Sequence, residues 1–475
     1  MGIYLATKFL QIFRVIENNK NETLKNKDKS NIPYEKNDKF QAKSEGGKNC
    51  EYELKDLSKI NKPNKSCLEN IKSPYLLNNI FQYFSKIKGM KLISINKKLQ
   101  AKLNISIKDY KEYNQIIIEI ITYKKIRGNK NYFINVKKKE EPYFHIYFNI
   151  IEKEIKRNYF TKNDNFSKII VVIDNEVKSF YRLFADIKIV KEIKFVKFNR
   201  KNIIDMDRMF LGCSNLTNLD ISKMKTDNIK DMSFMFYSCS SLTSLDISNF
   251  NTGNLVDMYF MFYGMNALKK LNISNINTSK VTNMSYLFSG CKSLQELKLS
   301  SFQTDNVERM DNMFQNCSSL IELDLSNFVT HKLTSLSFMF YDCLNLNKLN
   351  ISNFITENVS NMSNMFSYCQ SLKNLDISNF KMNNVNNMEG MFYKCTNLEK
   401  VNISFCNTEK LTNTKLMFYE CKSLISLDIS NFNMDNVSDM SYMFHNCKEE
   451  LINNIKKNNE GFLEIAFEKN DKIND

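Results

Sequence analysis

The 475-residue sequence contains no tryptophan, only four prolines and only 11 glycines. All four prolines (Pro33, Pro63, Pro74 and Pro142) precede the repeats that fill the second half of the chain, which therefore contain none. Lysine and asparagine are abundant instead. This bias is typical of an AT-rich genome rather than of a physical demand on the fold.

Long apolar runs and catalytic motifs are also missing. No stretch of 18 apolar residues occurs, so we expect no transmembrane segment. Glycine-rich phosphate loops, zinc-protease motifs and nucleophile-elbow motifs are absent. The three histidines (His145, His331 and His445) are too few for a zinc cluster or a general base. The sequence therefore predicts a protein that is not an enzyme and has no cofactor or metal.

The net charge of +15 comes from the N-terminal part of the chain, whereas the later repeats are close to neutral. A basic segment can bind nucleic acid or an anionic membrane. Here the lysines alternate with asparagines and are not concentrated with arginine and aromatic residues. This pattern favours a solvated tract, and we expect no nucleic acid partner.

A Met-Phe pair recurs every 26 residues through the second half of the chain. A cysteine follows four residues after almost every Met, with Met265 in the one exception. Such a period predicts one structural unit stacked on copies of itself. The pairs begin at Met209, Met235, Met261, Met313, Met339, Met365, Met391, Met417 and Met443, with Leu287-Phe288 as the variant.

Residues 254–279 serve as an example of one repeat. Leu255, Met258, Met261, Phe262 and Met265 are spaced like one face of a helix, and the alternating segment 271–274 reads as a short strand. Asn254 and Asp257 have the form of a helix N-cap and its partner. The predicted fold class is therefore an α/β repeat, a curved solenoid with one short strand and one short helix per coil, and a small α+β N-terminal region.

Three constant columns favour structural roles. The cysteines occupy one place in successive coils, so we interpret them as buried thiols rather than disulfides or metal ligands. The serine column that includes Ser222 and Ser248 fits a structural role, which is either to close a turn or to form hydrogen bonds along the stack, better than a binding surface. The aromatic column that includes Phe250 and Phe302 is interpreted as core.

Outward-facing strand positions are the candidate binding surface, because they vary between coils and would form the concave face of a curved solenoid. The competing interpretation is that any exposed strand face must be polar. The putative partner-binding residues are Asp220, Asp246, Lys270, Glu296, Lys298, Glu322, Asp324, Lys348, Asp376, Lys400 and Asp428.

Composition shifts divide the chain into five regions. Residues 1–16 have the spacing of a short amphipathic helix, which would allow peripheral membrane contact, and residues 17–70 are a disordered Lys/Asn-rich segment. Residues 71–165 form a small α+β region with helices up to residue 104 and strands at 115–123, 131–137 and 144–151. The solenoid covers 166–447, including a degenerate capping coil at 168–200 with Leu183-Phe184 in register and Ile169 on the column of Phe195. Residues 448–475 form a C-terminal cap.

No secretory signal is evident at the N-terminus, and the start Met1-Gly2 misses a myristoylation signal by one position, because Thr7 comes one residue late. We therefore expect a cytoplasmic protein, with the cell surface as the alternative.

The run M-F-x-x-C-x-x-L-x-x-L-D-I-S-N-F-x-T-x-N-[LV]-x-x-M at Met235–Met258 resembles the BspA-type leucine-rich repeats, which are related to Treponema-type repeats. The resemblance covers about residues 168–447. It implies a leucine-rich-repeat solenoid that binds proteins, often as a surface protein or adhesin of bacteria and microbial eukaryotes. The chain differs from the family in lacking the expected secretion signal and in placing Phe250-type residues where ordinary repeats carry Asn.

Residues 74–103 are similar in layout to an F-box, in which a helix with Leu-x-x-Ile-Phe leads to a later helix with Asn-Lys. An F-box followed by leucine-rich repeats would imply a substrate adaptor of a ubiquitin ligase. The sequence thus leaves three functions open: a protein-binding scaffold, such an adaptor, and a secreted or surface adhesin.

Overall fold

A computed structural model describes residues 107–123, 129–149, 153–403, 408–458 and 461–468. The chain divides into two compact units, Met1–Tyr113 and Asn114–Asp475. The helix α5 (Ile107–Asn114) contains the boundary between them. The predictions for residues 1–16, 17–70, the helices within 71–104 and the F-box-like segment all lie outside the described residues. None of the helices that the structure describes is long and apolar enough to cross a membrane.

The second unit begins with a five-stranded sheet in the order β3-β5-β1-β6-β7. Alternate residues of its central strand, Ile116, Ile118 and Ile120, are fully buried, because successive side chains of a strand point to opposite faces. The strands are β1 (Ile116–Thr122), β3 (Phe144–Phe148), β5 (Ile169–Ile173), β6 (Val190–Lys197) and β7 (Asn218–Asp220). A separate pair joins β2 (Asn131–Tyr132) to β4 (Tyr159–Phe160), and the 3-10 helix η2 (Lys138–Tyr143) precedes β3.

Two of the three predicted N-terminal strands are thereby confirmed as β1 and β3, whereas the strand expected at 131–137 is only two residues long. The sheet also combines antiparallel and parallel strand pairs. The strands β3, β5, β1 and β6 are antiparallel, but β6 pairs with β7 in parallel, through Glu192↔Asn218. The antiparallel strands therefore share one sheet, and one core, with the first coil of the solenoid.

The register of the first coil is partly as predicted. The rings of Phe184 and Phe210 stack with centroids 5.6 Å apart and an interplanar angle of 1°, which confirms that Leu183-Phe184 starts the Met-Phe column. The placement of Ile169 on the column of Phe195 is wrong. The strand β5 pairs antiparallel with β1, which lies between β5 and β6, so Ile169 belongs to the antiparallel sheet and not to the stack.

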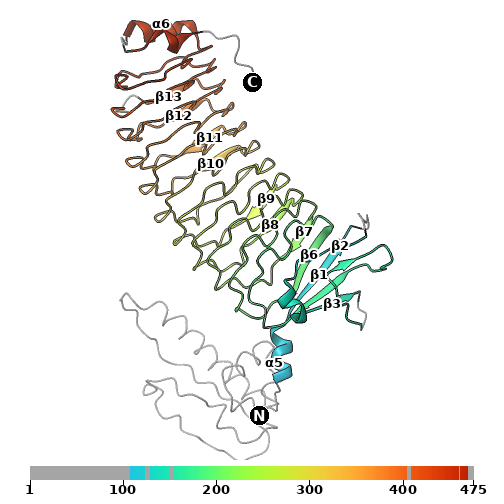
Figure 1. Cartoon of the computed structure of the whole chain (residues 1–475). Coiled ribbons are helices and arrows are strands. Elements are labelled where there is room, and N and C mark those ends of the chain that lie inside the picture. The colour runs from blue at the N-terminus through green and yellow to red at the C-terminus, as the bar shows by residue number, and fades with distance from the viewer. Residues whose placement is uncertain (1–106, 124–128, 150–152, 404–407, 459–460, 469–475) are drawn as a thin grey trace, which may run out of the picture. The chain divides into compact units, whose positions relative to one another are not determined.

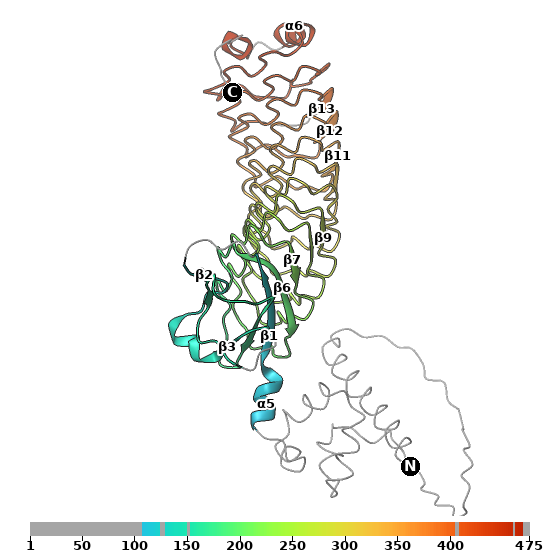
Figure 2. The same cartoon turned by 90° about the vertical axis from the view of Figure 1, so that its right-hand side faces the viewer.

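The solenoid itself is a stack of coils in chain order, as both views show (Figures 1 and 2). On one side, short strands pair in parallel with partners 26 residues away, for example Ser244↔Lys270. On another side, isolated parallel bridges such as Asp257↔Asn283 keep the same register. The strands are β8 (Ser244–Asp246), β9 (Lys270–Asn272), β10 (Glu322–Asp324), β11 (Lys348–Asn350), β12 (Asn374–Asp376) and β13 (Lys400–Asn402).

The predicted helix of each coil is wrong: a chain of tight turns occupies its place. In the coil of Met261, every second amide donates within the coil, as in Met261 N to Met258 O at 3.1 Å. The amides between them donate to the next coil, as in Phe262 N to Leu287 O at 3.0 Å. Phe260 and Gly264 take positive φ values of 56° and 68°, which a right-handed helix excludes.

The spacing between coils explains why turns replace the helix. Parallel strands lie roughly 4.8 Å apart, whereas a helix with its side chains is about 10 Å wide. A helix in every coil would force the coils apart on that side. Turns are flat enough to stack, and the Phe262 and Phe288 rings lie only 5.5 Å apart. A stack without helices has no wide side opposite its strands, so helix width gives no reason for the strand face to be concave.

The core is one continuous column of buried side chains. The Phe rings of the Met-Phe pairs stack in parallel from coil to coil, and Met, Leu and Cys fill the space around them. Threonines such as Thr330 and asparagines such as Asn358 bond the backbone of the neighbouring coil. Each coil therefore depends on its neighbours for both apolar contacts and hydrogen bonds, as expected of repeat proteins.

The C-terminal end of the stack is covered by α6 (Glu449–Asn458), with Leu451 and Ile455 buried. The 3-10 helix η3 (Glu464–Phe467) then returns to the last coil. There Tyr442 N donates to Ile465 O and Phe444 N donates to Ala466 O, in place of a further coil.

Candidate partner-binding face

The outward strand positions form one polar face along the solenoid. The strands bury their central residue, such as Leu245, and leave the residues on either side outside. Of the predicted partner-binding residues, all are exposed except Asp220, which is half-buried. The structure therefore places them on one face, in two parallel columns.

The acidic column of this face has a local structural role. Asp246 Oδ1 accepts a hydrogen bond from Ser248 N at 2.9 Å, and Asp428 Oδ1 accepts from Ser430 N at 3.1 Å and Ser430 Oγ at 2.7 Å. These bonds from the serine hold the pKa of both carboxyls below its usual range. Asp220, Asp324 and Asp376 accept the same bond from the serine two residues on. Of the two structural roles predicted for the serine column, the structure shows turn closure at these positions.

The side chains of the other column close no such turn in the described coils. Glu322 and Lys348 of adjacent coils lie 3.9 Å apart, and Glu296 is 3.2 Å from Lys298, which takes the place of an acidic-column aspartate in that coil. The side chains of Lys348 and Lys298 are 79% and 83% exposed, so these ion pairs contribute little to stability. An exposed isoleucine, Ile321, stands directly before Glu322. This column holds the side chains that a partner could engage without disturbing the coil.

A hollow of about 560 Å³ interrupts the same face between β11 and β12. The strands β10 and β11 form one two-stranded sheet and β12 and β13 form another, and the hollow spans the join. Sequence reasoning identified Lys348 but not the rest of this lining, since only the interrupted pairing defines the hollow. It is lined by Asn347, Lys348, Ser371, Lys373, Asn374 and Asn397.

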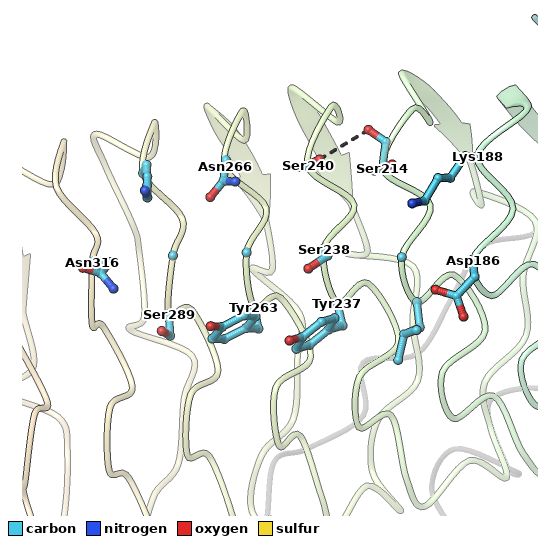
Figure 3. A pocket seen from close by; sticks show the side chains of 15 residues that line it. Asp186, Lys188, Ser214, Tyr237, Ser238, Ser240, Tyr263, Asn266, Ser289 and Asn316 are labelled. Carbon is cyan, nitrogen blue, oxygen red and sulfur yellow. Dashed lines mark hydrogen bonds between the residues drawn. The ribbon is translucent and has the colours of Figure 1, made fainter.

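Sequence reasoning also missed a groove of about 550 Å³ elsewhere on the early coils (Figure 3). One row of its side chains contains Tyr237, Tyr263 and Ser289, and a second row contains Lys188, Ser214, Ser240 and Asn266. Between the rows runs the position before each cysteine, or before Met265 in the cysteine column, which is Gly212, Ser238, Gly264 and Gly290 in these coils. Three glycines in one column of a glycine-poor chain were the available signal.

The cysteine column is buried and protonated. The nine cysteines that the structure describes are all buried and free of disulfides. Each thiol donates to a phenylalanine carbonyl of the preceding coil, as Cys317 Sγ does to Phe288 O at 3.2 Å. Burial raises the pKa of Cys317 to about 12. The buried-thiol interpretation is confirmed, and the described residues contain no group of three or more His, Cys, Asp or Glu side chains placed to hold a metal ion.

The stacked coils and the residues that recur every 26 positions define the class of protein, which is a β-solenoid of leucine-rich coils. This is the class that the resemblance to BspA-type repeats implied. The chain belongs to the DUF285 family, described as "Mycoplasma protein of unknown function", which matches residues 178–271, 264–350 and 345–458.

Comparison with other proteins adds two solved structures. A leucine-rich repeat protein from Bacteroides ovatus is 19% identical, with 69% of this chain and 90% of that chain covered and a TM-score of 0.30. The TLR13–ssRNA13 complex is 17% identical, with 51% and 44% covered and a TM-score of 0.18. Scores this low carry no argument about function. No curated protein matches the sequence.

Proposed function

We propose that the protein is a non-catalytic scaffold that binds a protein partner through the strand face of its solenoid. The observation that carries the proposal is that the two outward columns have different structural roles. Aspartates and asparagines of the acidic column close turns, whereas the column of Lys270, Glu296, Glu322, Lys348 and Lys400 varies in charge and is exposed.

The hollow between β11 and β12 supports this assignment and suggests where the contact centres. It brings Lys348 and Lys373 together with amide and hydroxyl groups, a lining that suits carboxylates and backbone carbonyls of a protein. Exposed Ile321, on the neighbouring coil, would add an apolar contact at its edge. Charge contacts of this kind set partner choice and association rate.

A site-specific crosslinking experiment tests the proposal. A photo-crosslinking residue is placed at position 348, or at position 332 as a control outside the hollow, and the protein is exposed to an extract of its source cells. We expect one protein to be captured from position 348 only, and the Lys348→Glu/Lys373→Glu variant to lose it.

The matched control variant is Lys332→Glu/Lys410→Glu, which changes charge equally at exposed lysines that bond asparagine side chains of the neighbouring coil. Equal capture from positions 348 and 332, or undiminished capture by the Lys348→Glu/Lys373→Glu variant, would exclude the strand face as the site.

We further propose a cytoplasmic location, with the cell surface as the alternative. Imaging a tagged copy in intact cells, with and without permeabilisation, separates the two: antibody access without permeabilisation contradicts the cytoplasmic proposal.

A further inference from the structure

The groove beside Tyr237 and Tyr263 shares no residue with the strand-face site, and it differs from the rest of the solenoid in its shape. The position before each cysteine takes positive φ in every described coil, and Asn316, Asp342, Tyr368, Lys394 and Glu420 all adopt it. Positive φ alone therefore does not demand Gly212, Gly264 and Gly290. What these glycines remove is side-chain volume, and the floor of the groove is left open as a result.

Part of the polar lining of the groove is available to a ligand, although the Ser240 hydroxyl donates to Ser214 O at 3.3 Å and can only accept from one. Elsewhere in the solenoid, asparagine and threonine side chains form hydrogen bonds with the backbone of the neighbouring coil. Among the described residues, no hydrogen bond joins the hydroxyls of Tyr237, Tyr263 or Ser238 to another group. Burial raises the pKa of Tyr237, so its hydroxyl stays protonated and can donate. Free donors and acceptors beside a concave floor are what a polar ligand requires.

The tyrosine row is held rigidly. The rings of Tyr237 and Tyr263 stack with centroids 4.7 Å apart and an interplanar angle of 10°. Phe260 packs against both, at 5.8 Å and 5.0 Å, and stacks on Phe234 behind them. Ser289 follows in the same column, so no third ring stacks on Tyr263 there (Figure 3). Rings fixed in advance lose little conformational entropy when a ligand packs against them.

The lining excludes other classes of ligand. A nucleic acid strand needs a row of cations, but the groove has only Lys188 and Lys292, which belong to coils at its two ends, and Asp186 lies near Lys188 (Figure 3). An extended peptide would need an unpaired backbone edge. The amides of Gly212, Gly264 and Gly290 each already donate to the next coil at 2.7 Å. Leu211 is the one aliphatic side chain of the lining, which leaves no pocket for an apolar ligand.

We propose that this groove binds a neutral oligosaccharide, lying across successive coils with a sugar ring packed against Tyr263. Hydroxyl and amide groups from Ser238, Ser240 and Asn266 match a chain of sugar hydroxyls, and an aromatic ring matches the apolar C–H face of a sugar. Each coil contributes one residue to each row of the groove, so consecutive sugar units meet the same two rows, and the two tyrosines supply the aromatic contact in the middle coils.

Binding of neutral hexasaccharides to the full chain tests the proposal, with cello-, malto-, manno- and chitohexaose as probes. Saturation-transfer NMR detects binding and titration calorimetry measures the affinity. We expect at least one of the four to bind. Tyr263→Ser and Gly264→Asn should each weaken that binding by at least about tenfold, since loss of one central contact removes more than 1.4 kcal/mol.

The repeat supplies both variants and their controls. Ser289 and Asn316 already occupy the columns of Tyr263 and Gly264, so both variants use residues that the coil accepts. Tyr393→Ser changes the same column outside the groove, and Gly253→Asn places on another turn the residue found at Asn383. Both controls should bind like the parent chain.

Three results would overturn the proposal: no binding by any of the four hexasaccharides, equal affinity in the groove and control variants, or groove-dependent binding of a Gly/Ser-rich decapeptide in place of the sugars. Circular dichroism of each variant checks its fold. If Gly264→Asn alone unfolds, Tyr263→Ser decides the outcome. Capture at position 348 is independent of these variants, so failure here leaves the strand-face proposal standing.

Discussion

At the scale of single residues, the buried threonine column carries hydrogen bonds that no other side chain of its shape can make. Thr330 is fully buried, its Oγ1 donates to Ile355 O at 2.9 Å, and the same oxygen accepts from Ile355 N at 2.7 Å. Thr330→Val keeps the volume but leaves two backbone groups unpaired, which should lower the free energy of unfolding by about 1–3 kcal/mol. Urea denaturation measures this.

Thr412→Val is the control for Thr330→Val, because the Thr412 hydroxyl makes an exposed bond to Asn386 O at 2.9 Å. Water replaces that bond when it is lost. Equal losses of stability in the two variants would contradict the importance of burial.

Asp207 gives a pH-dependent prediction. Burial, together with the carboxylates of Asp231 and Asp205, raises the pKa of Asp207 to about 6, despite the opposing charge of Arg208. In the unfolded chain this pKa is about 3.9, so the folded state binds the proton more tightly and loses stability as the pH rises from about 4 to 6. Asp207→Asn should therefore raise the melting temperature at pH 7 more than at pH 4.5.

Asp324→Asn should behave differently from Asp207→Asn. Its hydrogen bond from Ser326 lowers the pKa of Asp324, so its ionised form favours folding, and that contribution disappears as the pH falls through the folded pKa. A larger gain for Asp207→Asn at pH 4.5 than at pH 7 would show that the burial of Asp207 is not the cause.

At the scale of the element, the unit of this protein is a run of turns with two left-handed positions per coil. Asn446 occupies one of them with φ of 55° and is exposed. Asn446→Val should destabilise the last coil by about 1–3 kcal/mol, because a β-branched residue resists positive φ. Asn446→Gly should be neutral or slightly stabilising. Hydrogen exchange of the backbone amides of Phe418 and Phe444, which donate to Met443 O and Ala466 O, reports on that coil. Equal exchange rates in the two variants would contradict the turn assignment.

At the scale of the whole molecule, the 26-residue register makes each coil removable. Deletion of residues 345–370 joins Leu344 to Ser371 with every column intact, so the chain should fold with a small loss of stability. Deletion of residues 345–369 shifts all later columns by one position and should abolish cooperative folding. Thermal melting and gel filtration compare the two, and similar behaviour of both deletions would show that the register is not what holds the stack together.

The sequence alone determined the period, the buried columns, the position of Leu183-Phe184 and the outward strand face. These follow from side-chain chemistry, since a residue type that returns every 26 positions marks one place in every coil. It did not determine the conformation between the strands. Leu255, Met258, Met261 and Phe262 fit one face of a helix equally well as a series of turns.

Only the tertiary structure decided between helix and turns, because the choice depends on the narrow spacing that neighbouring coils impose and on amides that bond across it. The same is true of Ile169, which matched a column by arithmetic but lies in an antiparallel sheet. It is also true of the candidate sites. The acidic column proved to close turns, and the groove of Gly212, Gly264 and Gly290 exists only where successive coils place their missing side chains next to one another.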